Sequence, residues 1–364
     1  MRNSSTLSIW DSCGLNLSMA FTTVRTGVTD TYSNQTAGNH SSDGCSRESP
    51  LKTIMFPILY SILLILGLSL NGLAAWVFLR IPSKSHFIIY LKNIVVADII
   101  MTLTFPFKIL SDSNVASVGM RVFVCRVSSV LFYLTMYISI LFFGLISIDR
   151  CRKTMWPFVS TSQRHLLHRK LLSGFIWASL VALCLPNIIL TSRPNTSAHF
   201  KCSDLKTSMG LRWHEVVNHI CQVIFWGNLI VVIICYVLIS KELYKSIART
   251  RSQHAVSQGQ QKKTIIQLNV FLVLAVFFVC FVPFHFARVP YTISQTRGKM
   301  FNCQDKLLFF QLKESTLWLS SLNAVLDPLI YFFLCKSFRR SLFNTLSISP
   351  GCCRDLGTDT VSTG

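Results

Sequence analysis

One short stretch of the sequence places two basic side chains inside a long apolar run. In CFVPFHFARVPY, residues 280–291, His285 and Arg288 lie three positions apart, and Tyr291 follows at the same spacing. A helix turns by about 100° per residue, so these side chains share one face with Gln295, one turn further on. An Arg at the centre of a membrane helix costs about 2.5–3.5 kcal/mol on insertion scales. The stripe must therefore face a wet interior or an anionic partner.

Further polar side chains lie in the neighbouring apolar runs, several of them at helical spacing. These candidates for the same site are Tyr133, Tyr137, His214, Asn218 and Lys313. Aromatic rings and two fixed cations suit a nucleotide, because a ring can stack on the base while Arg and Lys bind phosphates. A charge-assisted hydrogen bond contributes about 1.5–3 kcal/mol, so two or three would offset the cost of burying Arg288. For Lys313 the alternative is a structural ion pair with the adjacent Glu314.

Seven long apolar segments can position these side chains. Each has about the 20 residues that a helix needs to cross a hydrocarbon core. Of the 364 residues, 51% are hydrophobic and only 14% are charged, which is the balance of a membrane protein. We predict an all-α membrane protein, a seven-transmembrane helix bundle with a short amphipathic eighth helix in KSFRRSLFNTL. The predicted spans are Ile54–Leu79, Phe87–Leu110, Val122–Ile148, Leu171–Leu190, Val216–Ile239, Ile265–Tyr291 and Leu307–Leu334.

Three parts follow from this pattern. We expect residues 1–52 to form an extracellular glycosylated tail, residues 53–346 the seven-helix bundle with its membrane-surface helix, and residues 347–364 a cytoplasmic tail. Residues 1–50 lack a basic start followed by an apolar core, so we expect no cleavable signal peptide. Lys and Arg gather in the loops of one face, which is therefore cytoplasmic. The predicted glycosylation sites, each in an Asn-X-Ser/Thr motif, are Asn3, Asn16, Asn34, Asn39 and Asn195.

The formal charge of +20 would suggest nucleic-acid binding in a soluble protein. Here the basic residues lie mainly between apolar runs, where membrane topology and lipid headgroups explain them. The sequence has no nucleic-acid-binding motif, Walker loop, HExxH or GxSxG. We therefore expect neither an enzyme nor a nucleic-acid partner.

Five of the 13 cysteines fall on the predicted outer side, where oxidising conditions favour bridges. Sequence alone leaves their connectivity open. A bridge between Cys125 and Cys202 would hold the loop before the fifth span over the mouth of the bundle. One between Cys45 and Cys303 would tie the tail to the last outer loop. We predict these two bridges, and Cys13 is left over.

Polar residues also lie deep inside four of the spans. They are Asn71, Asp98, Ser139, Asn323 and Asp327. Intramembrane carboxylates are candidates for function by default. The group can be a water-bridged network that only fixes helix packing, or it can also hold a cation. We expect a mixture, in which Asp98, Ser139, Asn323 and Asp327 bind Na⁺ in one state, and we expect no other cofactor.

Several local signatures occur in order along the spans. They are LNGLA (residues 70–74), VVADII (95–100), Asp149-Arg150-Cys151, Trp177 and DPLIY (327–331). Together they resemble the rhodopsin-like G-protein-coupled receptors over about residues 45–346. Longer blocks such as FYLTMYISI, WHEVVNHICQVIFW, CFVPFHFARVPYTISQTR and KESTLWL resemble the purinergic nucleotide receptors. The resemblance is greatest to the branch of the platelet ADP receptor and the UDP-sugar receptor.

The sequence departs from the family pattern at four positions. Cys151 stands where Tyr is usual, at a position that tunes G-protein contact. Phe281 replaces a common Trp and Asn228 a common proline, and both look like features of this branch. Cys184 replaces a Ser in the LPN block, so no ligand hydrogen bond is carried over to it.

The resemblance implies a role for each matching position. Tyr133 would stack on the adenine, with Asn187 and Asn218 near the base or the ribose. Tyr137 completes this side of the site. The residues that would face the phosphates are His214, Arg288, Tyr291, Gln295 and Lys313, with Arg121 and Lys206 closing over the mouth. His285 falls on the anion side of the site from its place on the polar stripe alone.

The implied function is that of a receptor for an extracellular nucleotide, most simply ADP. It would signal through a Gi-type G protein to inhibit adenylyl cyclase, with receptor kinases and arrestin as further partners. An agonist would draw Arg288 and Lys313 together, the sixth span would pivot at Pro283, and Arg150 beside Asp149 would meet a G-protein helix. The protein would lie in the plasma membrane, with its N-terminus outside and its C-terminus in the cytoplasm.

Other classes make different demands on the sequence. Within the branch, a receptor for UDP-sugars is the alternative, although KESTLWL and HFARVPYTISQTR favour ADP. A secondary transporter would show internal repeats, and none is evident between the two halves. A retinal protein needs a Lys in the middle of the seventh span, where Ser321 lies, and Lys313 is two turns too shallow. A membrane enzyme needs a clustered nucleophile and base, which His285 and scattered cysteines do not supply.

Overall fold

The computed structural model describes residues 49–83, 85–156, 163–192, 200, 202–251, 258–296 and 301–345. Side chains are described for these residues except 163–165, 246–247, 249–251, 258–271, 295–296 and 345. The chain forms two units, Met1–Gly44 and Cys45–Gly364, and all described residues belong to the second. The predicted glycosylation sites Asn3, Asn16, Asn34, Asn39 and Asn195 lie outside the described residues.

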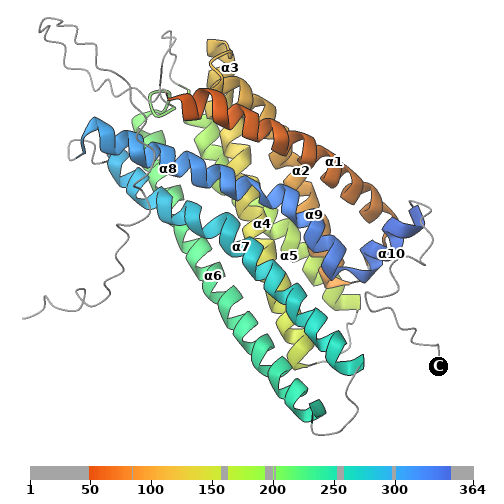
Figure 1. Ribbon diagram of the computed structural model, residues 1–364. Helices are drawn as coiled ribbons and strands as arrows, with labels where there is room; N and C mark the ends of the chain where they lie inside the picture. The colour runs from red at the N-terminus through yellow and green to blue at the C-terminus, as the bar shows by residue number, and fades with distance from the viewer. Residues whose placement is uncertain are drawn as a thin grey trace, which may run out of the picture. The chain divides into compact units, whose positions relative to one another are not determined.

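Helices dominate the described residues, among which no strand occurs. The elements are η1 (Leu51–Met55), α1 (Phe56–Arg80), α2 (His86–Asp112), α3 (Val118–Phe123), η2 (Val124–Ser128), α4 (Ser129–Met155), α5 (Gln163–Ile189), α6 (Ser208–Arg251), α7 (Gln258–Thr296), α8 (Cys303–Ser321), α9 (Asn323–Leu334) and α10 (Lys336–Thr345) (Figure 1). By length and composition, seven of these helical segments can cross a membrane, with α3–η2–α4 and α8–α9 counting as one each. The predicted seven-helix bundle and its following short helix are thereby confirmed.

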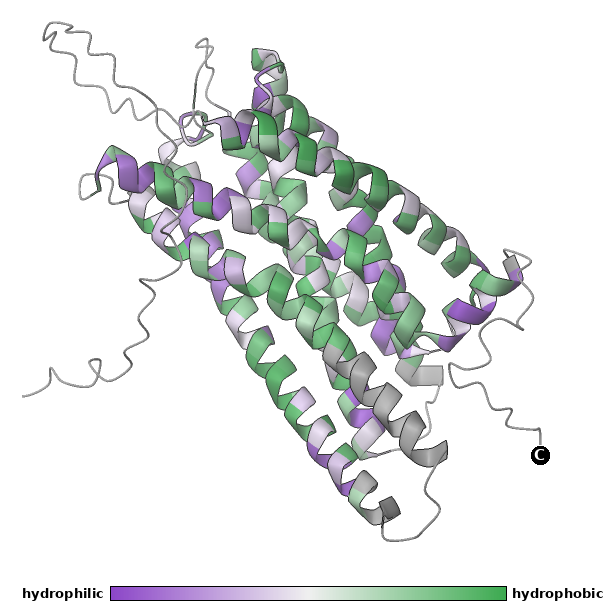
Figure 2. Cartoon of the chain, viewed as in Figure 1, coloured by the Kyte–Doolittle hydropathy of each residue, from purple (hydrophilic) through white to green (hydrophobic). Residues whose placement is uncertain are grey.

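The third span is the centre of the bundle. Its α4 packs against α2, α5 and α6. In its most apolar window 72% of the residues are buried, against 17% in the fourth span. Hydrophobic residues occupy the middle of most helices, while polar ones gather toward the ends and on α10 (Figure 2). Many large apolar side chains along the helices are exposed, as a bilayer requires, and the polar side chains buried between the helices are candidates for function.

Most of the described helices extend beyond their predicted spans, and two of the differences have a clear physical reason. α6 runs from Ser208 to Arg251, well beyond the apolar run, because polar residues continue a helix outside the lipid as readily as apolar ones continue it inside. The seventh span breaks at Leu322, between α8 and α9. Pro328 has no N–H to donate to Ala324, and the Asn71 side chain of α1 donates to that carbonyl instead, at 2.6 Å.

Asn228, where the family usually has proline, joins the two central helices. Its Nδ2 donates to the Ile140 carbonyl of α4 at 2.7 Å. The side chain fits there only because position 144 is glycine: a Cβ on Gly144 would lie 1.9 Å from the Asn228 Oδ1. Close packing and one interhelical hydrogen bond thus depend on the same pair of residues.

Replacing Gly144 with Ala should destabilise the protein by about 1–3 kcal/mol, because Asn228 must leave its site and its hydrogen bond. The measurement is the thermal unfolding temperature of the purified protein. Gly227→Ala is the matched control, since a Cβ there meets nothing within 4 Å. Adding Asn228→Ala to Gly144→Ala should recover part of the loss. Equal unfolding temperatures for Gly144→Ala and Gly227→Ala would contradict this packing.

Candidate functional site

Arg288 of α7 lies among three of the predicted site residues. Its guanidinium donates to the Tyr137 Oη at 3.1 Å and to the Asn218 Oδ1. It also lies 4.9 Å from the centre of the Tyr133 ring. Only 7% of Arg288 is exposed, so hydrogen bonds and an aromatic face replace the water that a buried cation loses. The inward faces of α4, α6 and α7 thus meet at one cation.

His285 closes a directional chain of hydrogen bonds. Its Nδ1 lies 2.8 Å from the Phe281 carbonyl, which can only accept, so this nitrogen carries the proton. Its Nε2 then accepts from the Tyr137 hydroxyl at 3.0 Å, and Tyr137 in turn accepts from Arg288. The Phe225 ring stacks on the imidazole at 3.6 Å, and no part of His285 is exposed. We expected His285 on the anion side of the site, whereas this geometry favours a role in positioning Tyr137.

A second cluster joins the C-terminal end of α2 to α8. Glu314 accepts from Lys313 at 2.6 Å and from Lys108 at 2.8 Å, and Lys108 also pairs with Asp112 at 2.9 Å. The Lys313 ammonium lies 5.4 Å from the centre of the Tyr291 ring. Sequence reasoning named Glu314 as a partner for Lys313 but missed Lys108 and Asp112. Their spacing of i and i+4 in TFPFKILSD was the available signal.

Positive charge from three segments converges around His214 of α6. The charges of Lys206, Arg288 and Lys313 all act on its imidazole. Lys206 lies in the loop before α6, and burial together with repulsion from Arg288 lowers the pKa of its ammonium to about 8. Bringing like charges together is unfavourable unless an anion joins them. The electrostatics of this region therefore favour an anionic ligand.

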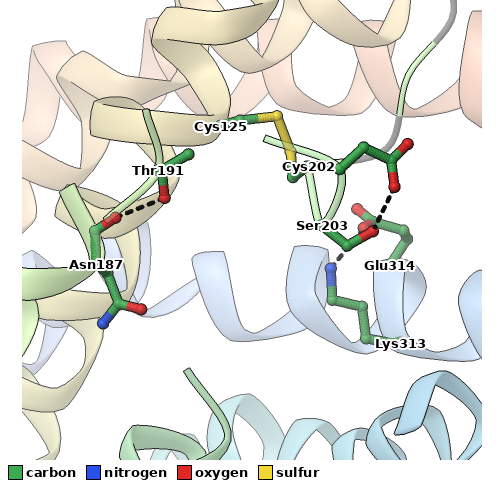
Figure 3. The surroundings of a disulfide bond; sticks show 8 residues. Cys125, Asn187, Thr191, Cys202, Ser203, Lys313 and Glu314 are labelled. Atoms are coloured by element: carbon green, nitrogen blue, oxygen red, sulfur yellow. Dashed lines mark hydrogen bonds and ion pairs between the residues drawn. A yellow bond between two sulfur atoms is a disulfide. The ribbon is translucent and has the colours of Figure 1, made fainter. Parts of the chain in front are cut away.

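A disulfide fixes the loop that carries Lys206. Cys125 of η2 is bonded to Cys202, with 5.3 Å between the Cα atoms (Figure 3). The loop is further held by the Thr207 N–H, which donates to the Leu190 carbonyl at 3.1 Å. The predicted Cys125–Cys202 bridge is thus present. Cys303 is also disulfide-bonded, and its predicted partner Cys45 lies outside the described residues.

For three further predicted ligand residues, Asn187, Arg121 and Gln295, the described structure gives no contact with Arg288. Asn187 is buried, and its Oδ1 has no hydrogen-bond partner in the part of the chain that the structure describes. Arg121, on α3, donates to the Asn114 side chain at 3.4 Å. Gln295 lies in the last turn of α7, but its side chain is outside the described set. Asn187 therefore has an acceptor left for a ligand.

All four predicted Na⁺ ligands, Asp98, Ser139, Asn323 and Asp327, are fully buried. Asp98 and Asp327 are neighbours, because each carboxyl group acts on the other. Tyr331 donates to one Asp98 oxygen at 3.1 Å. Among the described residues, the other Asp98 oxygen and the side-chain oxygens of the remaining three have no hydrogen-bond partner. Orphaned buried oxygens are the donors that a hard cation prefers, so these residues fit Na⁺.

The opposite end of the third span holds the predicted G-protein-coupling residues. Asp149 pairs with Lys153 at 2.8 Å and with His86 of α2 at 3.4 Å. The Arg150 guanidinium lies 3.8 Å from the centre of the Phe87 ring. Sequence reasoning missed His86, because no single-sequence signal links the start of α2 to the end of α4. The two helices are thus joined at this end through Asp149 and Arg150.

Comparison with known proteins agrees with this architecture. Residues 70–331 match the family model of the 7 transmembrane receptor (rhodopsin family). The chain is 48% identical to human purinoceptor 13 over 84% of its own length and 85% of that protein. It is 45% identical to bovine purinoceptor 14 (84% and 89% covered) and 42% identical to mouse G-protein coupled receptor 87 (85% and 86% covered).

The chain therefore belongs to the rhodopsin family of seven-transmembrane receptors. Within that family it falls in the purinergic branch predicted from its motifs. It is a receptor rather than an enzyme, and a multi-pass protein of the plasma membrane. Its partners are an extracellular ligand and a heterotrimeric G protein.

Proposed function

We propose that this receptor is activated by an extracellular nucleotide, with ADP as the agonist, and inhibits adenylyl cyclase through a Gi-type G protein. The observation that carries the proposal is the buried Arg288 against Tyr133, with Lys206 and Lys313 acting on the same region. A diphosphate supplies a counter-charge for Arg288 and Lys206, which have no carboxylate partner among the described residues, and an aromatic face suits its base.

In the proposed complex the base stacks on Tyr133 near Asn187, whose buried oxygen accepts from it. The phosphates take over donors of Arg288 that now reach Asn218 and Tyr137. Tyr291, Gln295 and Lys313 complete the phosphate side, with His214, Lys206 and Arg121 toward the mouth. The phosphates draw Arg288 and Lys313 together, so the end of α7 that carries Arg288 moves inward and the helix pivots at Pro283. The other end of α7 then moves outward, which leaves Arg150 accessible to the G protein.

The agonist is tested in cells that express the chain. ADP should lower forskolin-raised cyclic AMP, and pertussis toxin should abolish the effect, with mock-transfected cells as the control. A response to UDP-glucose with silence to ADP would move the assignment to the UDP-sugar alternative. A response that survives pertussis toxin would overturn the Gi assignment alone.

The topology of the ends completes the proposal. The tail of residues 1–52 lies outside and is glycosylated, the bundle spans residues 53–346, and residues 347–364 lie in the cytoplasm with receptor kinases and arrestin. An epitope tag at the N-terminus should be stained on intact cells, and one at the C-terminus only after permeabilisation. The reverse pattern would refute this orientation.

Binding of the agonist should weaken as the pH rises through the pKa of Lys206, which is about 8. A bound phosphate stabilises the ammonium, so the pKa of Lys206 is higher in the complex and binding above that pH requires proton uptake. Affinity is therefore highest below pH 8 and should fall about tenfold once the free ammonium is lost. The measurement is radioligand displacement from about pH 7 to about pH 10.

Lys206→Arg is the matched control, because a guanidinium keeps its charge over that range. Its pH profile should be nearly flat. The terminal phosphate of the ligand ionises near pH 6, below the window. Identical pH profiles for the two receptors would show that Lys206 does not contact the phosphates.

We further propose that Asp98, Ser139, Asn323 and Asp327 bind Na⁺ in the inactive state. Because Na⁺ would bind the inactive bundle better than the active one, it should lower agonist affinity. Replacing Na⁺ by N-methylglucamine should raise agonist affinity in the natural receptor and leave Asp98→Asn unchanged. A Na⁺ effect that persists in Asp98→Asn would place the cation elsewhere.

A further inference from the structure

An open cavity lies where the end of α1, the start of α2 and α10 come together, and none of its lining residues belongs to the Arg288 site. Its volume is about 480 Å³, within the range of about 300–1,000 Å³ for small-molecule sites. One wall consists of Arg80 and Ile81 with Ile88 of α2, and the other is a face of α10 with Ser337, Arg340 and Ser341.

The polar lining matches a phosphate group. Ser337, Arg340 and Ser341 stand at i, i+3 and i+4, so they share one face of α10. Arg80 faces them from α1, where its guanidinium lies 4.2 Å from the centre of the Trp76 ring. The cavity lining contains no carboxylate from the described residues. Two guanidinium groups from different helices, with hydroxyl donors between them, are suited to a polyanionic phosphate.

The surroundings of the cavity indicate a lipid as the source of that phosphate. Ile81 and Ile88 give the cavity an apolar side. On the outside of α1, Leu79 is 84% exposed and Trp76 42% exposed, as expected of side chains that face hydrocarbon and the membrane interface. An acyl chain can follow this surface directly from the cavity, whereas a soluble phosphate would gain nothing from it.

α10 is held in place by its other face. Phe338 is buried, with its ring 5.0 Å from that of Phe78 in α1, and Leu342 is buried one turn later. The polar face of α10 is therefore presented to the cavity by packing against the bundle and does not have to be ordered by the ligand. A site prepared in this way loses less conformational entropy on binding.

We propose that this cavity binds the phosphorylated headgroup of an anionic phospholipid of the inner leaflet, with Arg80 and Arg340 holding the phosphates. The assignment to the inner leaflet rests on the orientation proposed above. The binding itself does not depend on ADP or on Gi, so the two proposals can fail separately.

The test uses the full chain in lipid nanodiscs, which expose both leaflets and need no agonist. Binding of phosphatidylinositol 4,5-bisphosphate is compared by native mass spectrometry with that of phosphatidylserine at matched total charge. The natural receptor should prefer the phosphoinositide by about tenfold or more. Arg80→Gln and Arg340→Gln should lose this preference, while Lys336→Gln, which removes a charge from α10 outside the cavity, should keep it.

Ser341→Asp adds a second, independent variant, because it places a carboxylate in the cavity without removing either arginine. It should abolish the preference while the thermal unfolding temperature stays that of the natural receptor. An equal loss in Lys336→Gln would show diffuse attraction by basic residues and overturn the site. Displacement of the lipid by soluble inositol trisphosphate at the same concentration would overturn the lipid as the ligand.

Discussion

Replacing Arg288 with Ala should lower agonist potency about a hundredfold or more. The guanidinium is buried and has two directed donors, which now reach Tyr137 and Asn218. Two charge-assisted hydrogen bonds to phosphates, each contributing about 1.5–3 kcal/mol, disappear with it. The measurement is the concentration–response curve for cyclic AMP inhibition, at surface expression matched by antibody labelling of an N-terminal tag.

Two variants separate the role of Arg288 from a general effect of charge. Arg288→Lys keeps the charge but loses the planar fork, so its potency should lie between those of the natural receptor and of Arg288→Ala. Arg212→Ala removes an exposed arginine from the first turns of α6 and should change potency little. Unchanged potency of Arg288→Ala at equal surface expression would rule out its contact with the phosphates.

Replacing Glu314 with Gln should destabilise the receptor by about 3–5 kcal/mol, because removing one member of a buried charged cluster leaves the others uncompensated. Glu314 is 5% exposed and lies between Lys108 and Lys313. Without its charge, Lys108 keeps Asp112 as a partner, while Lys313 has no carboxylate partner among the described residues. The measurement is the thermal unfolding temperature of the purified, ligand-free receptor.

Glu215→Gln is the matched control for Glu314, since Glu215 is exposed on α6. The double variant Lys108→Gln, Glu314→Gln should be destabilised by less than the sum of its single changes. Each single change leaves the other member of the Lys108–Glu314 ion pair without its counter-charge, whereas the double change removes both charges of that pair. An added diphosphate agonist should recover part of the stability of Glu314→Gln by neutralising Lys313. Equal unfolding temperatures for Glu314→Gln and Glu215→Gln would refute the buried cluster.

The bundle could be predicted because length and hydropathy alone define a helix that crosses lipid. The polar stripe on α7 could also be predicted from the sequence, because a helix has a known period and a cation in an apolar run must face the interior of the bundle. Which residue meets Arg288 could be narrowed but not determined, since Tyr133 and Tyr137 share a face. The structure gives Tyr137 the hydrogen bond and Tyr133 the ring contact.

The missed residues have a common cause. Lys108 and Asp112 lie near the end of an apolar run, where charges ordinarily mark the boundary of a span. Their pairing with Glu314 depends on the approach of α8, which no local pattern contains. The partner of the Ala324 carbonyl likewise comes from another helix, since Asn71 of α1 donates to the carbonyl that Pro328 leaves without a partner.

The directional chain from Arg288 through Tyr137 and His285 to the Phe281 carbonyl has a thermodynamic consequence. The guanidinium is already oriented before any ligand arrives, so most of the entropy of ordering it was lost when the protein folded. What an agonist gains at Arg288 is therefore an exchange energy, the difference between a phosphate oxygen and the neutral oxygens of Tyr137 and Asn218. Ligands whose oxygens are no better acceptors than these should bind this receptor weakly, however well their bases stack.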